Sequence, residues 1–194
     1  MTIINIAIFA SGGGSNANAI INYFKKHTAI NVTHIYCNRK AAGVFNIATQ
    51  ANIAASYLPK TSFANPTYTL ALLKTHNINV IVLAGFLLKI PEWLIAAYPN
   101  KILNIHPALL PLHGGLGMYG MHVHNAVYHA KATQTGITIH LVNKNYDDGT
   151  VLFSAACPVL PTHTPTTIAA NVLALEHLHY PKVIENYIDN YLLD

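Results

Sequence analysis

The stretch IAIFASGGGSNANAI, residues 6–20, joins an apolar run to three consecutive glycines and then to a pattern typical of a helix. An uninterrupted apolar run is typical of a strand that is buried on both faces of a sheet. Ser15 and Asn16 follow the glycines, and both are residue types that cap helix N-termini. The stretch therefore predicts a strand, a tight loop and a helix, which is the first unit of an α/β fold.

The rest of the chain repeats this alternation. Apolar runs bounded by turn residues alternate with helical patterns, which predicts βαβ units on a mostly parallel central sheet with helices on both faces. The expected strands are 3–10, 32–37, 54–58, 79–84, 101–106, 136–143 and 151–157, and the expected helices are 16–26, 42–51, 65–76, 91–97, 122–131 and 165–187. With 194 residues and no linker or repeat, residues 1–194 are expected to form a single domain.

Composition narrows the classes of function. Hydrophobic residues make up 52% of the chain and charged residues 9%, which excludes a disordered chain. The formal charge of +4 comes from dispersed basic residues, so we expect an anionic small substrate and no nucleic-acid partner. Lys89 and Pro91 interrupt the apolar run 79–98, so no membrane partner is expected. Cys37 and Cys157 form no CxxC pair, and no signal-peptide pattern is present, which favours a cytoplasmic protein.

The glycine loop predicts an anion-binding site. Free N–H groups and the helix dipole at Gly14, Ser15 and Asn16 would hold a phosphate, and the missing Cβ of Gly14 would let the anion approach the backbone. The loop also fits the dinucleotide pattern G-x-G-x-x-A, but no carboxylate precedes Glu92 to hold a ribose. NAD is therefore disfavoured, while Arg39 leaves NADP open. A tight turn that packs a helix on a strand, without any ligand, is the structural alternative.

The second informative stretch is NIHPALLP, residues 104–111, at the end of an expected strand. Residues i and i+2 of a strand face the same way, so Asn104 and His106 project together. Pro107 lacks a backbone N–H and ends the strand after His106. Ligands of open α/β sheets bind at the carboxyl ends of strands, so this amide and this imidazole are expected in a ligand site.

The chain has only seven carboxylates, which makes their surroundings informative. Asp147 and Asp148 lie in a loop between two expected strands, where an acid could face the His106 imidazole, although Asp-Asp-Gly also suits a plain turn. Glu176 lies on a largely apolar helix face and needs a partner, either a ligand or a group of the protein, such as His179 on the same helix.

A metal site and a serine nucleophile are two further possibilities. Twelve histidines, with His122 and His124 near His106 in sequence, invite a metal site. No HExxH or cysteine-pair motif is present, and positions i and i+2 of a helix do not converge, so no metal is expected. Ser15 lacks the GxSxG context of a nucleophile, and no Walker motif is present.

Five motifs in order resemble one family over essentially the whole chain. SGGGSN (11–16), VLAGF (82–86), NIHPALLP, YDDG (146–149) and LEHLHYP (175–181) are similar to the phosphoribosylglycinamide formyltransferases of purine synthesis. The resemblance implies a Rossmann-like, three-layer formyltransferase fold. It also implies transfer of a formyl group from 10-formyltetrahydrofolate, the co-substrate, to the amine of glycinamide ribonucleotide, without metal or nicotinamide. These small molecules are the expected partners, and the expected assembly is a monomer or weak homodimer.

The resemblance also implies roles for individual residues. The catalytic residues that it implies are Asn104, His106 and Asp147. The substrate-binding residues are Gly14, Ser15 and Asn16 for the phosphate and Glu176 for the ribonucleotide. The folate-binding residues are Phe86, Leu87, Leu88, Asn104 and Asp147, with the loop around residues 140–149. The chain departs from many relatives at Leu88, where they carry a basic residue, at Leu112-His113, and in a longer loop at 113–120.

The expected chemistry follows from these roles. The Asn104 amide would donate to the developing oxyanion, and His106, held cationic by Asp147, would donate as well and pass a proton to the leaving nitrogen. Methionyl-tRNA formyltransferase and formyltetrahydrofolate hydrolase are related alternatives, but both usually carry a second domain, for which 194 residues leave no space. A nucleotide-binding module without catalysis is the alternative from another class, and it would have no need for Asn104, His106 and Asp147 together.

Overall fold

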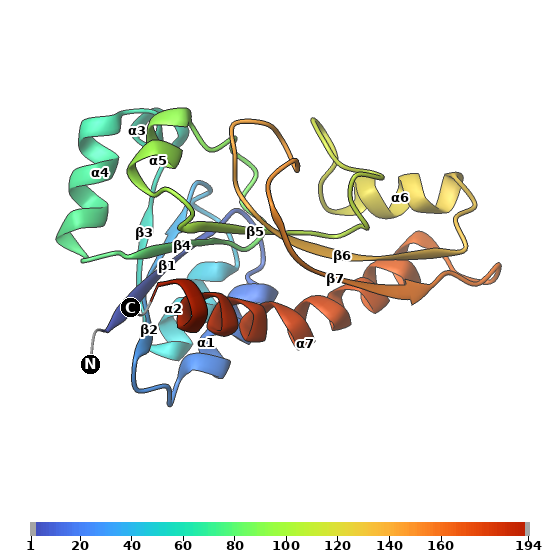
Figure 1. Ribbon diagram of the computed structural model, residues 1–194, viewed down its shortest axis with the longest axis horizontal. Helices are drawn as coiled ribbons and strands as arrows, with labels where there is room; N and C mark the ends of the chain where they lie inside the picture. The colour runs from blue at the N-terminus through green and yellow to red at the C-terminus, as the bar shows by residue number, and fades with distance from the viewer. Residues whose placement is uncertain (1–2, 193–194) are drawn as a thin grey trace.

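One sheet organises the structure, a computed structural model in which residues 3–192 are described. Its strand order is β3-β2-β1-β4-β5-β6-β7 (Figure 1). The strands are β1 (Ile4–Ala10), β2 (Ile30–Cys37), β3 (Ala54–Tyr57), β4 (Val80–Leu83), β5 (Ile102–His106), β6 (Gln134–Leu141) and β7 (Val151–Pro158). The helices are α1 (Ser15–Phe24), α2 (Val44–Ala51), α3 (Lys60–Phe63), α4 (Pro66–Thr75), α5 (Glu92–Ala97), α6 (Met121–His129) and α7 (Pro165–Tyr191).

All strands of the sheet run in one direction except β6. The strands β3, β2, β1, β4 and β5 pair in parallel, as expected for βαβ units. β6 pairs antiparallel with both β5 and β7. The predicted mostly parallel α/β sheet with helices on both faces is confirmed, and β5 is the strand at which the pairing changes from parallel to antiparallel.

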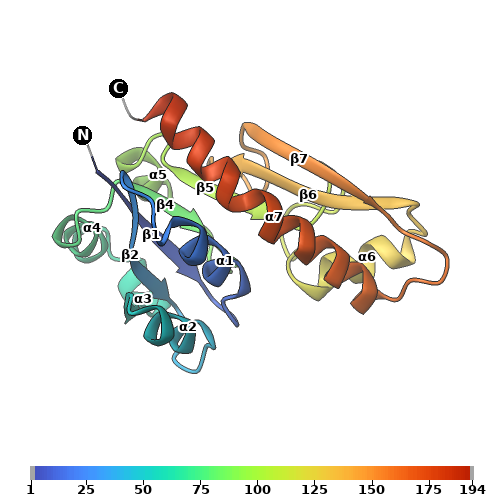
Figure 2. The same ribbon diagram turned by 90° about the horizontal axis from the view of Figure 1, so that it is seen from below.

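The central strand β1 explains why its sequence is apolar throughout. Ile6 and Ile8 belong to a core cluster that includes residues of α1, α2 and α7, while Ala7 and Phe9 belong to a second cluster with residues of α3, α4 and α5. All four side chains are fully buried. Figure 2 shows α7 lying along the sheet beside α1, with α3 and α4 away from it. Helices therefore cover both faces of the sheet, and burial of both faces demands a continuous hydrophobic run.

One helix was not predicted, and another extends beyond its predicted end. The short helix α3 follows Pro59 within a stretch expected to be a loop. Helix α7 starts at Pro165, as predicted, after the Thr164 side chain accepts a hydrogen bond from the N–H of Thr167, but it continues to Tyr191. Ile188 is completely buried in the added turn, so packing stabilises the extension beyond residue 187.

Gly14, rather than Ser15 or Asn16, is the N-cap residue of α1. It has a φ of 87°, and no side chain caps the helix, so the expected capping by Ser15 and Asn16 is wrong; these are the first two helical residues. A Cβ on Gly14 would lie 2.8 Å from Val44 Cγ2 and 2.9 Å from Val44 Cα. The missing Cβ therefore lets the loop pack against the start of α2, which differs from the expected role of admitting an anion.

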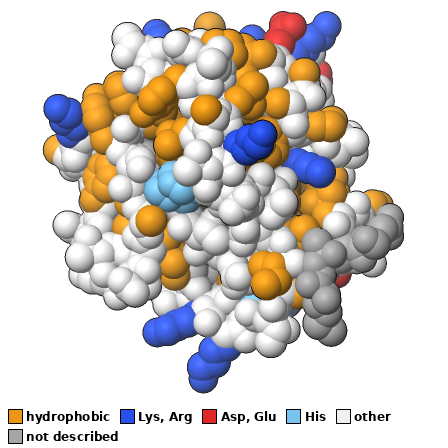
Figure 3. All heavy atoms as spheres, turned by 90° about the vertical axis from the view of Figure 1, so that its left-hand side faces the viewer, with side chains coloured by type: hydrophobic (Ala, Val, Ile, Leu, Met, Phe, Trp, Pro, Cys, Tyr) orange, Lys and Arg blue, Asp and Glu red, His pale blue; other side chains and the backbone are white. Residues whose placement is uncertain are grey.

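Basic residues are dispersed on one face of the molecule (Figure 3). On the face shown in Figure 3, Lys and Arg side chains stand singly or in pairs among hydrophobic and neutral atoms. None of the helices within residues 3–192 has the length and apolar character needed to cross a bilayer.

We predict that Gly14→Ala lowers the free energy of unfolding by about 1–3 kcal/mol, because an alanine is strained at positive φ and its Cβ overlaps Val44. Urea denaturation measures this change. Gly13→Ala is the control, since a Cβ on Gly13 meets nothing within 4 Å and its φ is not in the left-handed region. Equal losses for the two variants would contradict the packing role of Gly14.

Candidate active site

The pairing of β5 with β6 builds a polar patch from two strands. In this antiparallel register, Asn104 lies opposite His140 and His106 lies opposite Thr138. Directly opposite residues share a face of the sheet, as do residues i and i+2 of one strand. The predicted common orientation of Asn104 and His106 is thus confirmed. His140 and Thr138 are additional members that our reading of the sequence missed, although the alternation in Thr138-Ile139-His140 was a signal for them.

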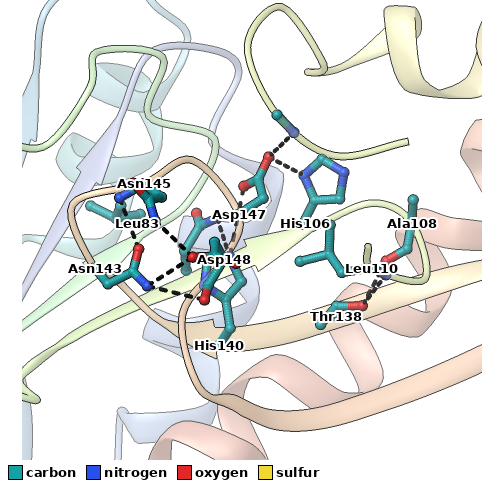
Figure 4. A network of polar contacts seen from close by, with 12 residues as sticks. Leu83, His106, Ala108, Leu110, Thr138, His140, Asn143, Asn145, Asp147 and Asp148 are labelled. Atoms are coloured by element: carbon teal, nitrogen blue, oxygen red, sulfur yellow. Dashed lines mark hydrogen bonds and ion pairs between the residues drawn. The ribbon is translucent and has the colours of Figure 1, made fainter. Parts of the chain in front are cut away.

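Thr138 holds the chain where it leaves β5. Its hydroxyl donates to the carbonyl oxygen of Ala108 over 2.8 Å and accepts from the N–H of Leu110 over 3.0 Å (Figure 4). Thr138 is almost completely buried, so these hydrogen bonds are shielded from water. The turn that follows His106 is therefore fixed by β6 in addition to its own prolines.

Asp147 faces His106, as predicted. Its Oδ2 lies 3.4 Å from Nδ1 of His106 and accepts a hydrogen bond of 2.9 Å from the N–H of Gly115. On the far side of the ring, Nε2 of His106 lies 2.8 Å from the carbonyl oxygen of His113. The loop 113–115 thus contacts both members of the pair through its backbone.

Asp148 points away from this pair. Its carboxylate accepts hydrogen bonds from Asn145 over 2.8 Å and from Asn143 over 3.4 Å, and these bonds lower its pKa. Figure 4 shows Asp148 turned toward the two asparagines and Asp147 turned toward His106. The predicted geometric separation of the two adjacent acids is therefore confirmed. Asp147 has a φ of 51°, a left-handed conformation that Asp and Asn tolerate better than other side chains.

The electrostatics of the pair correct one expectation. Burial lowers the pKa of His106 by more than the Asp147 carboxylate and the His113 carbonyl raise it. The expectation that Asp147 holds His106 cationic is therefore wrong for the free protein, because desolvation outweighs the ion pair. Burial raises the pKa of Asp147, but the imidazoles of His140 and His106 and the N–H of Gly115 lower it by more. The carboxylate, rather than the imidazole, carries the charge near neutral pH.

The hydrogen-bond partner of Glu176 lies on another helix. Nδ2 of Asn16, in the first turn of α1, donates to Oε2 of Glu176 over 2.6 Å. The predicted alternative of a pair with His179 is wrong, since that imidazole packs against Phe153 with ring centroids 4.8 Å apart. Burial raises the pKa of Glu176, and the hydrogen bond from Asn16 opposes this. Within the described chain, the buried Oδ1 of Asn16 has no hydrogen-bond partner.

One cavity of about 480 Å³ joins these two polar regions. Gly14 and Ser15 do not line it. Of the residues predicted for the site, those that line the cavity are Asn16, Phe86, Leu87, Leu88, Asn104, His106, Asp147 and Glu176. Leu87 is held by its N–H, which donates to the Ser11 hydroxyl over 2.9 Å. The cavity thus combines an apolar wall at 86–88 with polar groups from β5, the 142–149 loop, α1 and α7.

His124 is a further residue of this cavity that our site prediction left out. It lies on α6, is nearly buried and lines the cavity. Burial lowers its pKa, as does, to a smaller extent, the neighbouring His106. Across residues 3–192, no group of three or more His, Cys, Asp or Glu side chains is arranged to hold a metal ion.

Comparisons with known proteins agree with this geometry. A family model described as "Formyl transferase" matches residues 4–184. The chain belongs to the formyl transferase family. It is 37% identical over 185 residues to "Phosphoribosylglycinamide formyltransferase, chloroplastic" of Arabidopsis thaliana, covering 92% of this chain but only 63% of that relative. It is 32% identical over 187 residues to "Phosphoribosylglycinamide formyltransferase" of Bacillus subtilis, covering 94% and 93% of the two chains.

A solved structure of this formyl transferase family supports the fold. The crystal structure of phosphoribosylglycinamide formyltransferase from Brucella melitensis has a TM-score of 0.86 to this chain, with 33% identity and full coverage of both chains. The family resemblance inferred from the five motifs is therefore confirmed, and the seven-stranded sheet is the formyltransferase fold.

We predict that Asp147→Asn lowers the pKa of His106 further, because it removes the carboxylate that favours the charged imidazole. Asparagine keeps the shape of the side chain and tolerates the positive φ. Titration of the His106 ring by NMR measures the change. Asp148→Asn is the matched control and should leave the titration unchanged, since Asp148 faces Asn143 and Asn145. An unchanged or raised pKa in Asp147→Asn would contradict the pairing.

Proposed function

We propose that this formyl transferase passes a formyl group from 10-formyltetrahydrofolate to the amine of glycinamide ribonucleotide, a step of de novo purine biosynthesis. The observation that carries the proposal is the single cavity that Asn104, His106 and Asp147 share with Asn16 and Glu176. The names of the plant and bacterial relatives support the same reaction. Because the chain spans less than two thirds of the Arabidopsis relative, the activity is proposed from the site and the shared region.

The reaction needs a donor for an oxyanion and a route for a proton. Attack of the amine on the formyl carbon forms a C–N bond and places negative charge on the formyl oxygen. Collapse of this intermediate breaks the bond to the folate nitrogen, which receives a proton as the amine loses one. Asn104 lies at the carboxyl end of β5 and lines the cavity, so its N–H is available to the oxyanion.

We assign the proton transfer to His106 and Asp147. Nε2 of His106 faces a carbonyl oxygen, which can only accept, so the neutral ring carries its proton there and presents a lone pair at Nδ1 to Asp147. A proton taken up at Nδ1 converts this unfavourable contact into a hydrogen-bonded ion pair. The pair is therefore suited to hold the proton that the amine releases and to return it to the folate nitrogen, directly or through water.

The two ends of the cavity suit the two substrates. Glu176 offers an acceptor to ribose hydroxyls, and the N-terminus of α1 at Gly14 and Ser15 offers N–H groups to the phosphate beyond it. Phe86, Leu87 and Leu88 form the apolar wall assigned to the folate ring. Asn104 and Asp147 lie between the two ends, where the formyl group would be transferred.

Further parts of the proposal follow from the sequence. We propose that residues 1–194 act as one domain on these small molecules alone, as a monomer or weak homodimer in the cytoplasm, without a metal, a nicotinamide, a nucleic acid or a membrane. The relatives from plants are named as chloroplastic. The competing function is hydrolysis of formyltetrahydrofolate, in which water replaces the amine.

We expect an absorbance assay of folate deformylation to show transfer that depends on glycinamide ribonucleotide. A chelator should leave the rate unchanged, because Asn104, His106 and Asp147 supply the chemistry without a metal. Formate release at the same rate without the amine would favour the hydrolase and refute the proposal. Loss of activity with a chelator, restored by zinc, would refute the metal-free mechanism.

We expect Asp147→Asn to lower kcat by about 10²- to 10⁴-fold with little change in either KM, the loss typical of missing acid–base assistance. Steady-state kinetics with both substrates provides the measurement. Asp148→Asn should keep nearly full activity, because Asn replaces Asp well in a turn and Asp148 faces away from His106. An inactive Asp148→Asn beside an active Asp147→Asn would move the catalytic assignment to Asp148.

A further inference from the structure

His140 lies near two of the predicted site residues, Asn104 and Asp147, but was not itself predicted to belong to the site. It lies opposite Asn104 in the register of β5 and β6, and only 2% of its surface is exposed. Nε2 of His140 lies 3.1 Å from Nδ2 of Asn104, and Nδ1 lies 2.9 Å from the carbonyl oxygen of Leu141. Both ring nitrogens are thus within hydrogen-bond distance of a polar atom.

These two contacts determine where the ring carries its proton. The carbonyl oxygen of Leu141 can only accept, so Nδ1 of His140 must be the donor of that hydrogen bond. In a neutral imidazole, Nε2 then has a lone pair and can only accept. Of the two ends of the Asn104 amide, only the NH₂ group can donate to it. The contact between Asn104 and His140 is therefore an N–H of Asn104 donating to Nε2 of His140.

This hydrogen bond fixes the orientation of the Asn104 amide. A rotation of 180° about the last side-chain bond would place the amide oxygen against the lone pair of Nε2, and two acceptors would face each other in a buried site. The NH₂ group has a second N–H, which the bond to His140 leaves free. Since Asn104 lines the cavity, that N–H is available as a donor to a bound ligand.

We propose that His140 is a positioning residue that, as the neutral imidazole protonated at Nδ1, holds the Asn104 amide with its nitrogen toward the reacting formyl group. The assignment of the second N–H to the oxyanion rests on the proposed function, whereas the hydrogen bond itself does not. Orientation of a donor before the reaction lowers the cost of stabilising the oxyanion, which explains why a buried imidazole is placed opposite Asn104.

The Asp147 carboxylate lies near the same ring nitrogen and would favour a proton on it. Nε2 of His140 lies 3.7 Å from Oδ1 of Asp147, beyond hydrogen-bond distance and longer than its contact with Asn104. An imidazole protonated at Nε2 would instead donate to Asp147 and present its N–H to the Asn104 NH₂ group, leaving two donors face to face. Protonation at Nε2 would therefore require the opposite orientation of the Asn104 amide, with its oxygen toward the ring, so the proton position on His140 selects the orientation of Asn104.

NMR of ¹⁵N-labelled protein tests the hydrogen bond directly. We expect the His140 ring to show a protonated Nδ1 and an unprotonated Nε2 at the pH of the assay. The Asn104 NH₂ signals, identified by their loss in Asn104→Asp, should move in His140→Leu and stay in place in His129→Leu, an exposed histidine of α6 outside the cavity. A ring protonated at Nε2, or Asn104 signals that do not respond to His140→Leu, would overturn the proposal.

Kinetics tests the positioning role. His140→Leu should lower kcat by about 10- to 100-fold with both KM values changed less than about threefold. His140→Gln keeps an acceptor near the position of Nε2 and should recover most of the lost kcat. Equal activity of the His140→Leu and His140→Gln variants would refute the positioning role of His140. His129→Gln is the matched control. If the wild-type protein shows no transfer that depends on the ribonucleotide, the proposed function is refuted. The hydrogen bond between His140 and Asn104 can still be tested in that case, because the NMR measurements do not require turnover.

Discussion

Strand β5 pairs in parallel with β4 and antiparallel with β6, and the geometry of the site depends on this change of direction. Parallel pairing brings the carboxyl end of β5 to the edge of the sheet where ligands of α/β proteins bind. Antiparallel pairing with β6 then sets His140 and Thr138 directly opposite Asn104 and His106. Because opposite residues in a pleated sheet share a face, two short strand segments supply four polar side chains without any loop.

The loop between β6 and β7 completes the site because it must fold back over these side chains. The N–H of Leu141 donates to the carbonyl of Thr150 over 2.9 Å, and a Cβ on Gly149 would lie only 1.6 Å from the carbonyl oxygen of Leu141. This close approach brings the intervening residues over the polar patch, so that Asp147 meets His106 while Asp148 stays in the turn. A position without a side chain, beside the two acids, thus lets the loop close so that Asp147 enters the cavity and Asp148 does not.

Burial decides the charge of the site. A carboxylate beside an imidazole suggests a cationic ring, but His106 is almost completely buried, and desolvation lowers its pKa despite Asp147. The same burial makes each hydrogen bond of the ring important for stability, since a donor or acceptor without a protein partner cannot bond to water instead. Proton positions on His106 and His140 follow from carbonyl oxygens of His113 and Leu141, which are backbone groups that no sequence motif marks.

The sequence by itself determined the α/β fold, nearly every helix and strand, and the common orientation of Asn104 and His106, because hydrophobic periodicity and strand alternation are local properties. It also indicated that Glu176 needs a partner. Only the tertiary structure decided that this partner is Asn16, which lies 160 residues away in the chain, and that His140 stands against Asn104. It likewise decided the role of Gly14 against Val44 and the neutral state of His106. These features depend on strand register, close packing and burial, which arise only when distant segments meet.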